Sequence, residues 1–369
     1  MLMRAAVLTA FDAPLEVREV EAGDPGPGEV RVRIAASGVC GSDLKAIDGH
    51  SPVVPRPPVV CGHESAGTVD AVGPGVGAVA PGDPVLIAMN RPCGRCRMCA
   101  GAQAHLCTDD ARLKAIMGLL PDGGTRLRMD GAELRPYLGI GAFAEYAVVS
   151  ERALVPLPGD VPLAPMALLS CAVVTGVGAV LTTARVEPGS SVLVVGCGGV
   201  GLNAVQGAVV AGAARIVAAD LVEAKAEAAE RFGATETVAA GEGLEERVRD
   251  LVPGGVDYAI EATGVPEALA GAFAATRPGG TTVMVGSPPP GAEAAVPAGA
   301  LFASRRLMGC QGGDASPHRD LPRLVDLYRA GRLRLEELIT ERVDLEGVNG
   351  AVERVRKGET ARALVVPGA

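Results

Sequence analysis

Apolar runs alternate with amphipathic segments throughout the second half of the chain. Segment 191–196 is dominated by Val and Leu, which is typical of a strand buried on both faces of a parallel sheet. Further strands are predicted at 215–220, 256–261, 280–286 and 306–310, and helices at 224–231 and 266–276. This alternation predicts an α/β domain with a doubly wound parallel sheet.

The first half has a different pattern, in which short Val-rich runs are separated by Gly and Pro turns. Examples are 29–34 and 65–72, and together these runs predict an antiparallel β domain. The tail contains predicted helices at 321–330 and 348–357 and a final strand at 361–367, and we expect it to return to the first half. The predicted domains are therefore 1–172, 173–314 and the C-terminal return 315–369.

A glycine motif follows the strand at 191–196 and opens a helical stretch. Gly196, Gly198 and Gly201 form G-x-G-x-x-G between strand and helix, the context in which this motif binds a dinucleotide. The next strand ends at Asp220, where an acid accepts hydrogen bonds from the adenosine ribose and repels a 2′-phosphate. NAD is therefore predicted over NADP, and Lys225 is a further candidate contact to the ribose. The alternative is a Gly-rich turn in another kind of α/β domain.

Composition narrows the range of partners. Acidic residues exceed basic ones by 43 to 34, which argues against nucleic acid or an anionic membrane as the main partner. No uninterrupted run of eighteen apolar residues occurs, so we expect no spanning helix. The N-terminal residues lack the pattern of a signal peptide, which favours a cytoplasmic location.

Four of the nine cysteines lie within fifteen residues. Their spacing, C-x2-C-x2-C-x7-C, suits a closed tetrahedral shell around a structural Zn²⁺ in a lobe at 91–109, formed by Cys93, Cys96, Cys99 and Cys107. Nearby Arg91, Arg95 and Arg97 would offset the negative charge of such a tetrathiolate. An iron–sulfur cluster is the main alternative, since thiolates bind it too, and incidental buried cysteines are the other.

Several motifs together resemble the zinc-dependent medium-chain alcohol dehydrogenases over essentially the whole chain. They are the four-cysteine lobe, the glycine motif with Asp220, Gly38-Val-Cys40-Gly-Ser42-Asp43, Cys61-Gly-His63-Glu64-Ser-Ala-Gly67, Gly141-Ala-Phe-Ala-Glu-Tyr, and Cys171 with Thr175-Gly-Val-Gly178. The thirty-five residues between Cys107 and Phe143 resemble the dimeric branch that includes the class III, thiol-dependent formaldehyde enzymes. The resemblance implies a GroES-like catalytic domain beside a Rossmann domain, and a homodimer.

The resemblance also implies a second, catalytic zinc, held by Cys40, His63 and Cys171. A Cys₂His set leaves the fourth position open for an alcohol oxygen, whose pKa the zinc lowers so that an alkoxide can lose hydride to NAD. By position, Ser42 resembles the hydroxyl that accepts the substrate proton, Asp43 the acceptor that orients the ligating imidazole, and Glu64 a carboxylate near the zinc.

Two positions depart from the family pattern. Gly41 stands where relatives often have an Arg or His that contacts the cofactor pyrophosphate. Lys45 stands where many relatives have the His that ends the proton relay, and lysine is a poor base at neutral pH unless desolvation lowers its pKa. Lys45 is therefore a candidate for ending the proton relay or for binding cofactor or substrate. Otherwise the proton leaves through water, or His50 accepts it.

Remaining site residues are expected from the resemblance alone. Cofactor contacts are expected at Thr175, Gly199, Val200, Gly286 and Arg362. For Arg362 a solvated face is the alternative. Met89 and Phe143 correspond to residues that line the substrate pocket, although both could equally belong to the core.

Three functions stay open at this point. The first is oxidation of an alcohol by NAD. The second retains this machinery for a thiol adduct of formaldehyde or for a specialised biosynthetic alcohol or carbonyl compound. The third is a non-catalytic NAD-binding protein, which would have no need to keep Cys40, His63, Cys171 and Ser42 together.

Overall fold

A computed structural model describes residues 1–51 and 53–368. The chain divides into two compact units. One unit combines Met1–Cys171 with Ser316–Ala369, and the other is Ala172–Ala315. Residues 316 onward thus belong to the same unit as the first half of the chain.

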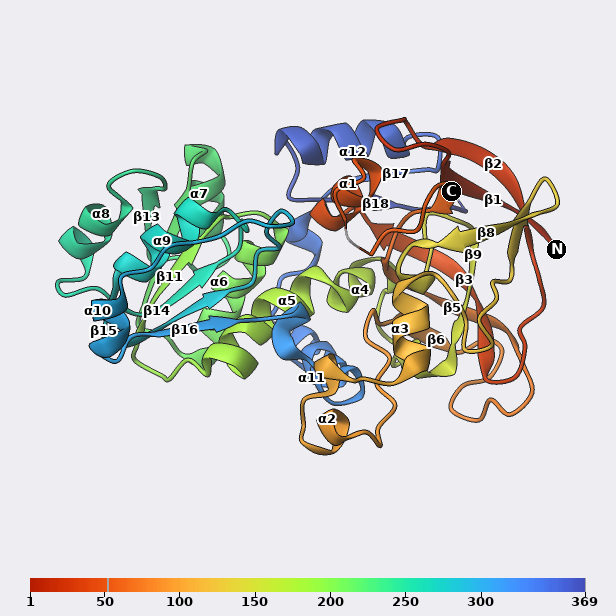
Figure 1. Cartoon of the computed structure of the whole chain (residues 1–369), viewed down its shortest axis with the longest axis horizontal. Helices are drawn as coiled ribbons and strands as arrows, with labels where there is room; N and C mark the ends of the chain where they lie inside the picture. Colours follow the sequence, from red (N-terminus) through yellow and green to blue (C-terminus); the bar gives the residue numbers. More distant parts are fainter. Residues whose placement is uncertain (52, 369) are drawn as a thin grey trace. The chain divides into compact units, whose positions relative to one another are not determined.

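The Ala172–Ala315 unit contains a six-stranded parallel sheet in the order β13-β12-β11-β14-β15-β16 (Figure 1). This is the strand order of a doubly wound dinucleotide-binding domain, whose crevice lies at the carboxyl ends of the first strands. The strands are β11 (Ser191–Val195), β12 (Arg215–Asp220), β13 (Glu236–Ala239), β14 (Val256–Glu261), β15 (Thr276–Met284) and β16 (Arg306–Gly309). The helices are α5 (Ala172–Gly178), a π-helix (Ala179–Ala184), α6 (Gly199–Ala211), α7 (Glu223–Glu230), α8 (Leu244–Leu251), α9 (Pro266–Ala274), α10 (Ala298–Phe302) and the 3₁₀ turn Gly312–Asp314.

The other unit is built on β-strands. Five strands, β1, β2, β7, β8 and β4, close into a barrel, and a second sheet runs β10-β6-β5-β3-β18-β17 with β9 also paired to β3. The strands are β1 (Leu2–Leu8), β2 (Glu16–Ala22), β3 (Glu29–Gly38), β4 (Val59–Val60), β5 (Glu64–Val72), β6 (Pro84–Ile87), β7 (Leu127–Met129), β8 (Ala132–Pro136), β9 (Tyr146–Ser150), β10 (Leu154–Pro156), β17 (Ile339–Val343) and β18 (Arg362–Val365).

Short helices connect these strands. They are α1 (Gly41–Ile47), α2 (Arg97–Ala100), α3 (Asp110–Ile116), α4 (Leu163–Met166), α11 (Pro317–Arg329) and α12 (Val348–Lys357), with 3₁₀ turns at Ala104–Leu106, Tyr137–Gly139, Glu151–Ala153, Ala167–Ser170 and Glu336–Leu338. The tail reaches β3 through β18, where Leu364 pairs with Gly38. The end of β3 is therefore the point at which distant parts of the chain meet.

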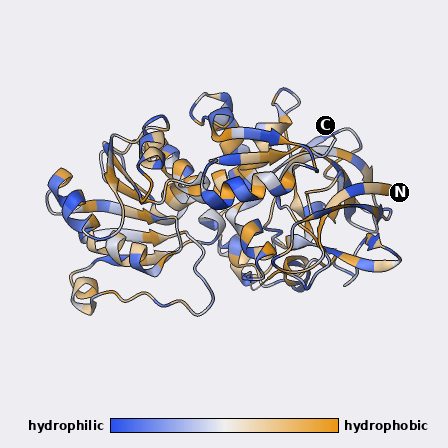
Figure 2. Ribbon diagram, turned by 90° about the horizontal axis from the view of Figure 1, so that it is seen from above, coloured by the Kyte–Doolittle hydropathy of each residue, from blue (hydrophilic) through white to orange (hydrophobic). Residues whose placement is uncertain are grey.

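The cores are aliphatic, as a chain without Trp requires. Figure 2 shows hydrophobic residues concentrated in the strands, while the helices mix hydrophobic and hydrophilic positions. On α12, Val348, Ala351 and Val352 are buried at the spacing expected for one face of a helix, and they contribute to a core cluster with Val39 and Leu345.

The structure differs from the sequence-based expectation in a few elements. The first unit is not wholly antiparallel, because β4 pairs with β8 and β17 with β18 in parallel. Strand β17 was not expected, because its three central residues are all polar or charged and break the apolar–polar alternation of a strand. No single described helix is long and apolar enough to span a membrane; one bent pair, Leu163–Ser170 with Ala172–Ala184, fits by length and composition only.

Candidate active site

Three potential metal ligands converge where β3 ends and β5 begins. Cys40 lies two residues after the end of β3, at the N-cap of α1; His63 directly precedes β5, and Cys171 follows the turn Ala167–Ser170. The Cys171 Sγ lies 3.9 Å from the Cys40 Sγ and 3.4 Å from the His63 Nε2. All three side chains are buried.

These separations fit a zinc ion. With Zn–S bonds of about 2.3 Å, two sulfurs of a tetrahedral site lie about 3.8 Å apart. The three donor atoms lie within 4.8 Å of one another, so one ion can contact all of them. Two thiolates and an imidazole supply three ligands, which leaves the fourth position of a tetrahedral ion open.

Asp43 fixes the imidazole and both neighbouring backbone segments. Its Oδ1 lies 3.0 Å from the His63 Nδ1 and accepts a hydrogen bond from the Gly62 N–H, while its Oδ2 accepts one from the Cys40 N–H. The hydrogen bond at Nδ1 leaves Nε2 facing Cys171 and Ser42. Asp43 thus has the position of a residue that orients a ligating histidine.

The charges at this cluster suit a cation. A hydrogen bond from Cys171, together with the charges of Arg362 and His63, holds the pKa of Cys40 well below its usual range despite burial. Burial by itself would lower the pKa of His63, but the charge and hydrogen bond of Asp43 outweigh it and raise this pKa. The hydrogen bond with Cys40, together with burial, raises the pKa of Cys171, so Cys40 is the first of the two thiols to ionise.

Glu64 and Arg362 form a buried ion pair beside the three ligands. The Arg362 Nε lies 3.6 Å from the Glu64 Oε1, and its Nη2 lies 4.0 Å from the Cys40 Sγ. Arg362 is only 4% exposed, so the alternative of a solvated face for it is wrong: β18 runs beside β3 and carries this side chain inward. A Cβ at Gly38 would lie 2.8 Å from the Glu64 Cδ, so the carboxylate needs glycine at that position.

Ser42 and Lys45 both lie on α1 but in different surroundings. The Ser42 Oγ lies 3.0 Å from the His63 Nε2, next to the metal ligands. Lys45 is half-buried in the last turn of the helix, and His50 is exposed. Gly41 at the start of α1 is exposed, with nothing within 4 Å of a Cβ built on it.

Tyr137 was not expected at the site from the sequence. It is fully buried, and its ring meets the His63 imidazole edge to face at a centroid separation of 5.7 Å. Its hydroxyl lies 3.3 Å from the Ser42 carbonyl oxygen. No sequence motif identifies such a residue, because a single tyrosine cannot be distinguished in the sequence from an ordinary residue of the hydrophobic core.

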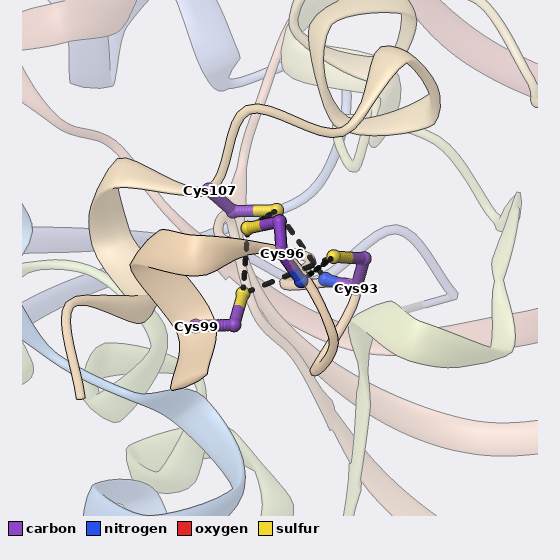
Figure 3. Close-up of side chains that lie close together, drawn as sticks. All are labelled: Cys93, Cys96, Cys99 and Cys107. Atoms are coloured by element: carbon purple, nitrogen blue, oxygen red, sulfur yellow. Dashed lines mark hydrogen bonds between the residues drawn. The ribbon is translucent and has the colours of Figure 1, made fainter. Parts of the chain in front are cut away.

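The four-cysteine lobe gathers its thiols into one cluster (Figure 3). The Cys99 Sγ lies 4.0 Å from that of Cys93 and 3.5 Å from that of Cys96, and the sulfurs of Cys96 and Cys107 are 3.8 Å apart. The Cys96 N–H donates to the Cys93 sulfur and the Cys93 N–H to that of Cys107. The positive φ of Gly94, 74°, allows the tight turn between the first two ligands.

This second cluster also fits zinc, with all four positions filled by protein. Backbone N–H groups of Cys99 and Thr108 lower the pKa of Cys96 to about 6, so a thiolate forms readily there. A closed tetrathiolate has no free position for a substrate and is typical of a structural site.

The glycine motif adopts the geometry of a phosphate-binding turn. Gly196 has φ 92°, Gly198 is the N-cap of α6, and a Cβ at Gly201 would lie 1.7 Å from the Gly196 carbonyl oxygen. The helix therefore begins against the strand as closely as glycine allows, with its free N–H groups at this turn. Gly199 and Val200 form the first residues of the helix.

A cavity of about 690 Å³ lies beside this turn, within the Ala172–Ala315 unit. Gly196, Asp220, Leu221, Thr263 and Val265 are among its lining residues. The Asp220 carboxylate accepts hydrogen bonds from the N–H groups of Cys197 and Val222, which hold it at the edge of the cavity.

Other predicted cofactor residues have different positions in this unit. In the described chain, Thr175 on α5, Lys225 on α7 and Gly286 after β15 are not among the residues that line this cavity. A Cβ at Gly286 would lie 2.0 Å from the Gly264 N, so this glycine allows two loops to approach closely. Their roles toward a cofactor stay predictions.

The two predicted substrate-pocket residues are core or near-core residues. Phe143 is fully buried in the cluster that contains Val39 and Cys61, and Met89 packs half-buried against a separate aliphatic cluster. Their predicted contact with substrate is not tested by this arrangement.

Comparison with known proteins gives matches along the whole chain. Family models match for the alcohol dehydrogenase GroES-like domain at 26–159 and for zinc-binding dehydrogenases at 199–330. Alcohol dehydrogenase class-3 of Cereibacter sphaeroides is 37% identical, covering 99% of this chain and 100% of the relative. S-(hydroxymethyl)glutathione dehydrogenase of Paracoccus denitrificans is 36% identical, with the same coverage. A similar solved structure is an alcohol dehydrogenase zinc-binding domain protein from Burkholderia ambifaria, with a TM-score of 0.94 at 34% identity. The match covers 100% of this chain and 99% of that structure.

The chain belongs to the zinc-dependent medium-chain alcohol dehydrogenases, with the Rossmann and GroES-like folds expected from the sequence. Within that family it is of the class III-like type. It is an enzyme, a zinc-dependent alcohol oxidoreductase. The expectation of a non-catalytic protein is thereby set aside.

The buried pair of Glu64 and Arg362 leads to a prediction about stability. Replacing Arg362 by Met removes the cation that faces a buried carboxylate, and we expect a loss of about 3–5 kcal/mol in the free energy of unfolding. Chemical denaturation followed by circular dichroism measures it.

A matched control is Arg356→Met, which breaks a more exposed ion pair with Asp48. Surface pairs contribute about 0–1 kcal/mol, so this variant should change little. Equal losses in the two variants would contradict the structural importance of the buried pair. The double variant E64Q/R362M should recover part of the loss.

Proposed function

We propose that the chain oxidises alcohols by hydride transfer to NAD, with two zinc ions per chain. In this proposal Cys40, His63 and Cys171 hold the catalytic zinc, and Cys93, Cys96, Cys99 and Cys107 hold the structural one. The observation that carries it is the contrast between the buried three-donor cluster, which has an open fourth position, and the closed four-donor cluster. When bound, the zinc supplies Lewis-acid polarisation of the substrate oxygen and NAD accepts the hydride.

The residues around the ligands would position the substrate and move its proton. The Ser42 hydroxyl, 3.0 Å from the His63 Nε2, is close enough to the open position to accept the alcohol proton. Asp43 keeps the imidazole oriented. Glu64 and Arg362 place a balanced pair of charges behind the ligands, so that the site gains no net charge from them.

Lys45 is proposed as the residue on the outer side of this relay. It lies one helical turn beyond Ser42 on α1, is half-buried, and neighbours the surface loop that carries His50. As an ammonium it can bind an anionic part of the cofactor or substrate, and only its neutral amine form can accept a proton passed on through solvent.

The choice of substrate has two candidates. Simple alcohols fit the family, and the relative in Paracoccus denitrificans is named for an adduct of formaldehyde with the thiol glutathione. The test is NADH formation, followed by absorbance, on a panel of alcohols and on formaldehyde with and without glutathione. Turnover only with the thiol would favour the adduct, and turnover of simple alcohols would favour the general activity.

Cys40→Ala should reduce turnover by at least about 10³-fold, because it removes a ligand of the metal that polarises the substrate. The zinc content, measured by atomic absorption, should fall from two to one per chain. Cys61→Ala is the matched control: Cys61 is equally buried and close in sequence, but lies outside both clusters. Near-normal activity of Cys40→Ala would overturn the assignment of this zinc site.

Asp220→Gly should lower the preference for NAD over NADP by about tenfold or more, equivalent to 1.4 kcal/mol. The acid lines the cavity and would repel a 2′-phosphate. The ratio of kcat/KM for the two cofactors measures the effect. Glu242→Gly removes another acid from the same cavity and should leave the ratio unchanged; an unchanged ratio in Asp220→Gly would refute the assignment.

A homodimer is proposed through the edge strand β16. This strand ends the parallel sheet, all four of its residues are exposed, and neighbouring Phe302 is 93% exposed. An open strand edge with apolar side chains can pair with a second copy about a two-fold axis.

Met308→Lys should therefore shift the protein from dimer to monomer in sedimentation experiments at micromolar concentration. Met117→Lys is the control, since Met117 has a similar exposure, 41% against 39%, and belongs to the other unit. A wild-type monomer, or an unchanged dimer in Met308→Lys, would contradict the proposed interface.

A further inference from the structure

A strained turn carries the tyrosine that packs against His63. Tyr137–Gly139 forms a 3₁₀ turn in which Leu138 has φ 50° and Gly139 has φ 62°. A non-glycine residue in the left-handed region costs free energy and persists only when its surroundings hold it there. The contacts that hold this turn therefore also determine where Tyr137 lies.

Arg91 supplies such contacts from the edge of the four-cysteine lobe. Its Nη2 donates to the carbonyl oxygens of Leu138, at 2.8 Å, and Gly139, at 3.0 Å. Arg91 is 5% exposed, and no carboxylate within residues 1–51 and 53–368 pairs with its guanidinium. A Cβ at Gly139 would lie 2.6 Å from the Arg91 Nη1, so the arginine fits only against glycine.

Burial of Arg91 has a cost that must be offset. Desolvation lowers its pKa to about 10, which leaves it charged at neutral pH in a nonpolar environment. A buried cation without a carboxylate is unfavourable unless hydrogen bonds satisfy it. The hydrogen bonds to the carbonyl groups of Leu138 and Gly139 therefore hold both the Arg91 side chain and the turn in place.

Tyr137 connects this turn to two catalytic groups. Its ring meets the His63 imidazole at an interplanar angle of 89°, and its hydroxyl lies 3.3 Å from the Ser42 carbonyl oxygen and 3.4 Å from the Ser51 hydroxyl. The edge-to-face contact restrains the imidazole in addition to Asp43's hydrogen bond at Nδ1. The hydroxyl restrains the backbone at Ser42, the residue proposed to accept the substrate proton.

We propose that Tyr137 is a positioning residue for His63 and Ser42, and that Arg91 holds it in place from the four-cysteine lobe. This assignment rests on the proposed function for the roles of His63 and Ser42. The four-cysteine lobe would then influence the position of His63 as well as the stability of the fold. A displacement of Arg91 would move the turn Tyr137–Gly139, and Tyr137 contacts His63 directly.

The test uses the zinc-loaded protein with ¹⁵N-labelled histidine. The chain has only four histidines, so the imidazole signals of His63 can be assigned with a His63 variant. Tyr137→Leu removes ring and hydroxyl and should shift the His63 signals, while those of His50, His105 and His318 stay. Tyr137→Phe keeps the ring and should leave the His63 signals close to wild type.

Kinetics separates the hydroxyl from the ring. Loss of a hydrogen bond that orients Ser42 should lower kcat of Tyr137→Phe by about three- to tenfold, with KM nearly unchanged. Tyr328→Phe removes a hydroxyl bonded to Glu336 in the same unit and should have wild-type kinetics. A Tyr137→Phe enzyme with wild-type kcat would overturn the role assigned to the hydroxyl.

The contribution of Arg91 is measured in the same spectra. Arg91→Met should shift the His63 signals as Tyr137→Leu does, whereas Arg97→Met, an exposed arginine of the same lobe, should not. Unmoved His63 signals in both Tyr137→Leu and Arg91→Met would overturn the proposal. A wild-type protein inactive on every alcohol would refute the proposed function, while the spectra would still decide whether Tyr137 and Arg91 position His63.

Discussion

Asp43 joins the two chain segments that carry Cys40 and His63, two of the three potential metal ligands. One carboxylate accepts hydrogen bonds from the N–H groups of Cys40 and Gly62 and lies against the His63 Nδ1, all in a fully buried environment. A buried carboxylate without such partners would be strongly destabilising. The end of β3, the start of β5 and the helix α1 are therefore held together by a group that the fold must satisfy, and the ligand geometry follows from that requirement.

The two cysteine-containing clusters are assembled in different ways. In the lobe, the four cysteines come from one short segment, so local turns and N–H···S bonds suffice to gather them. In the other cluster Cys171 is more than a hundred residues from Cys40 and His63, and the pairing of β3 with β5 brings the segments of Cys40 and His63 together. This cluster offers three donor atoms rather than four, and the buried Glu64–Arg362 pair next to it comes from strands β5 and β18.

Much of the fold and of the candidate site was predictable, because local sequence patterns determine those parts. The glycine motif between strand and helix, the acid at the end of β12 and the cysteine spacing all depend on residues close in sequence. Five of the six strands of the Ala172–Ala315 unit and the helices α6, α7 and α9 were predicted for the same reason, since the period of apolar residues is a local property. Strand β13 and helix α8 were not predicted. Strand β17 was missed because its alternation is weak and its polar residues resemble a loop.

The sequence by itself therefore determined the Rossmann architecture, the four-cysteine lobe and, through resemblance, the residues of the three-ligand cluster. Only the tertiary structure decided the surroundings of that cluster: Arg362 turned inward onto Glu64, and Tyr137 held against His63 by a turn that Arg91 fixes. These contacts join residues that are far apart in the chain and have no motif of their own. Their partners are set by strand register and by the need to satisfy buried polar groups, which exist only once the sheets have formed.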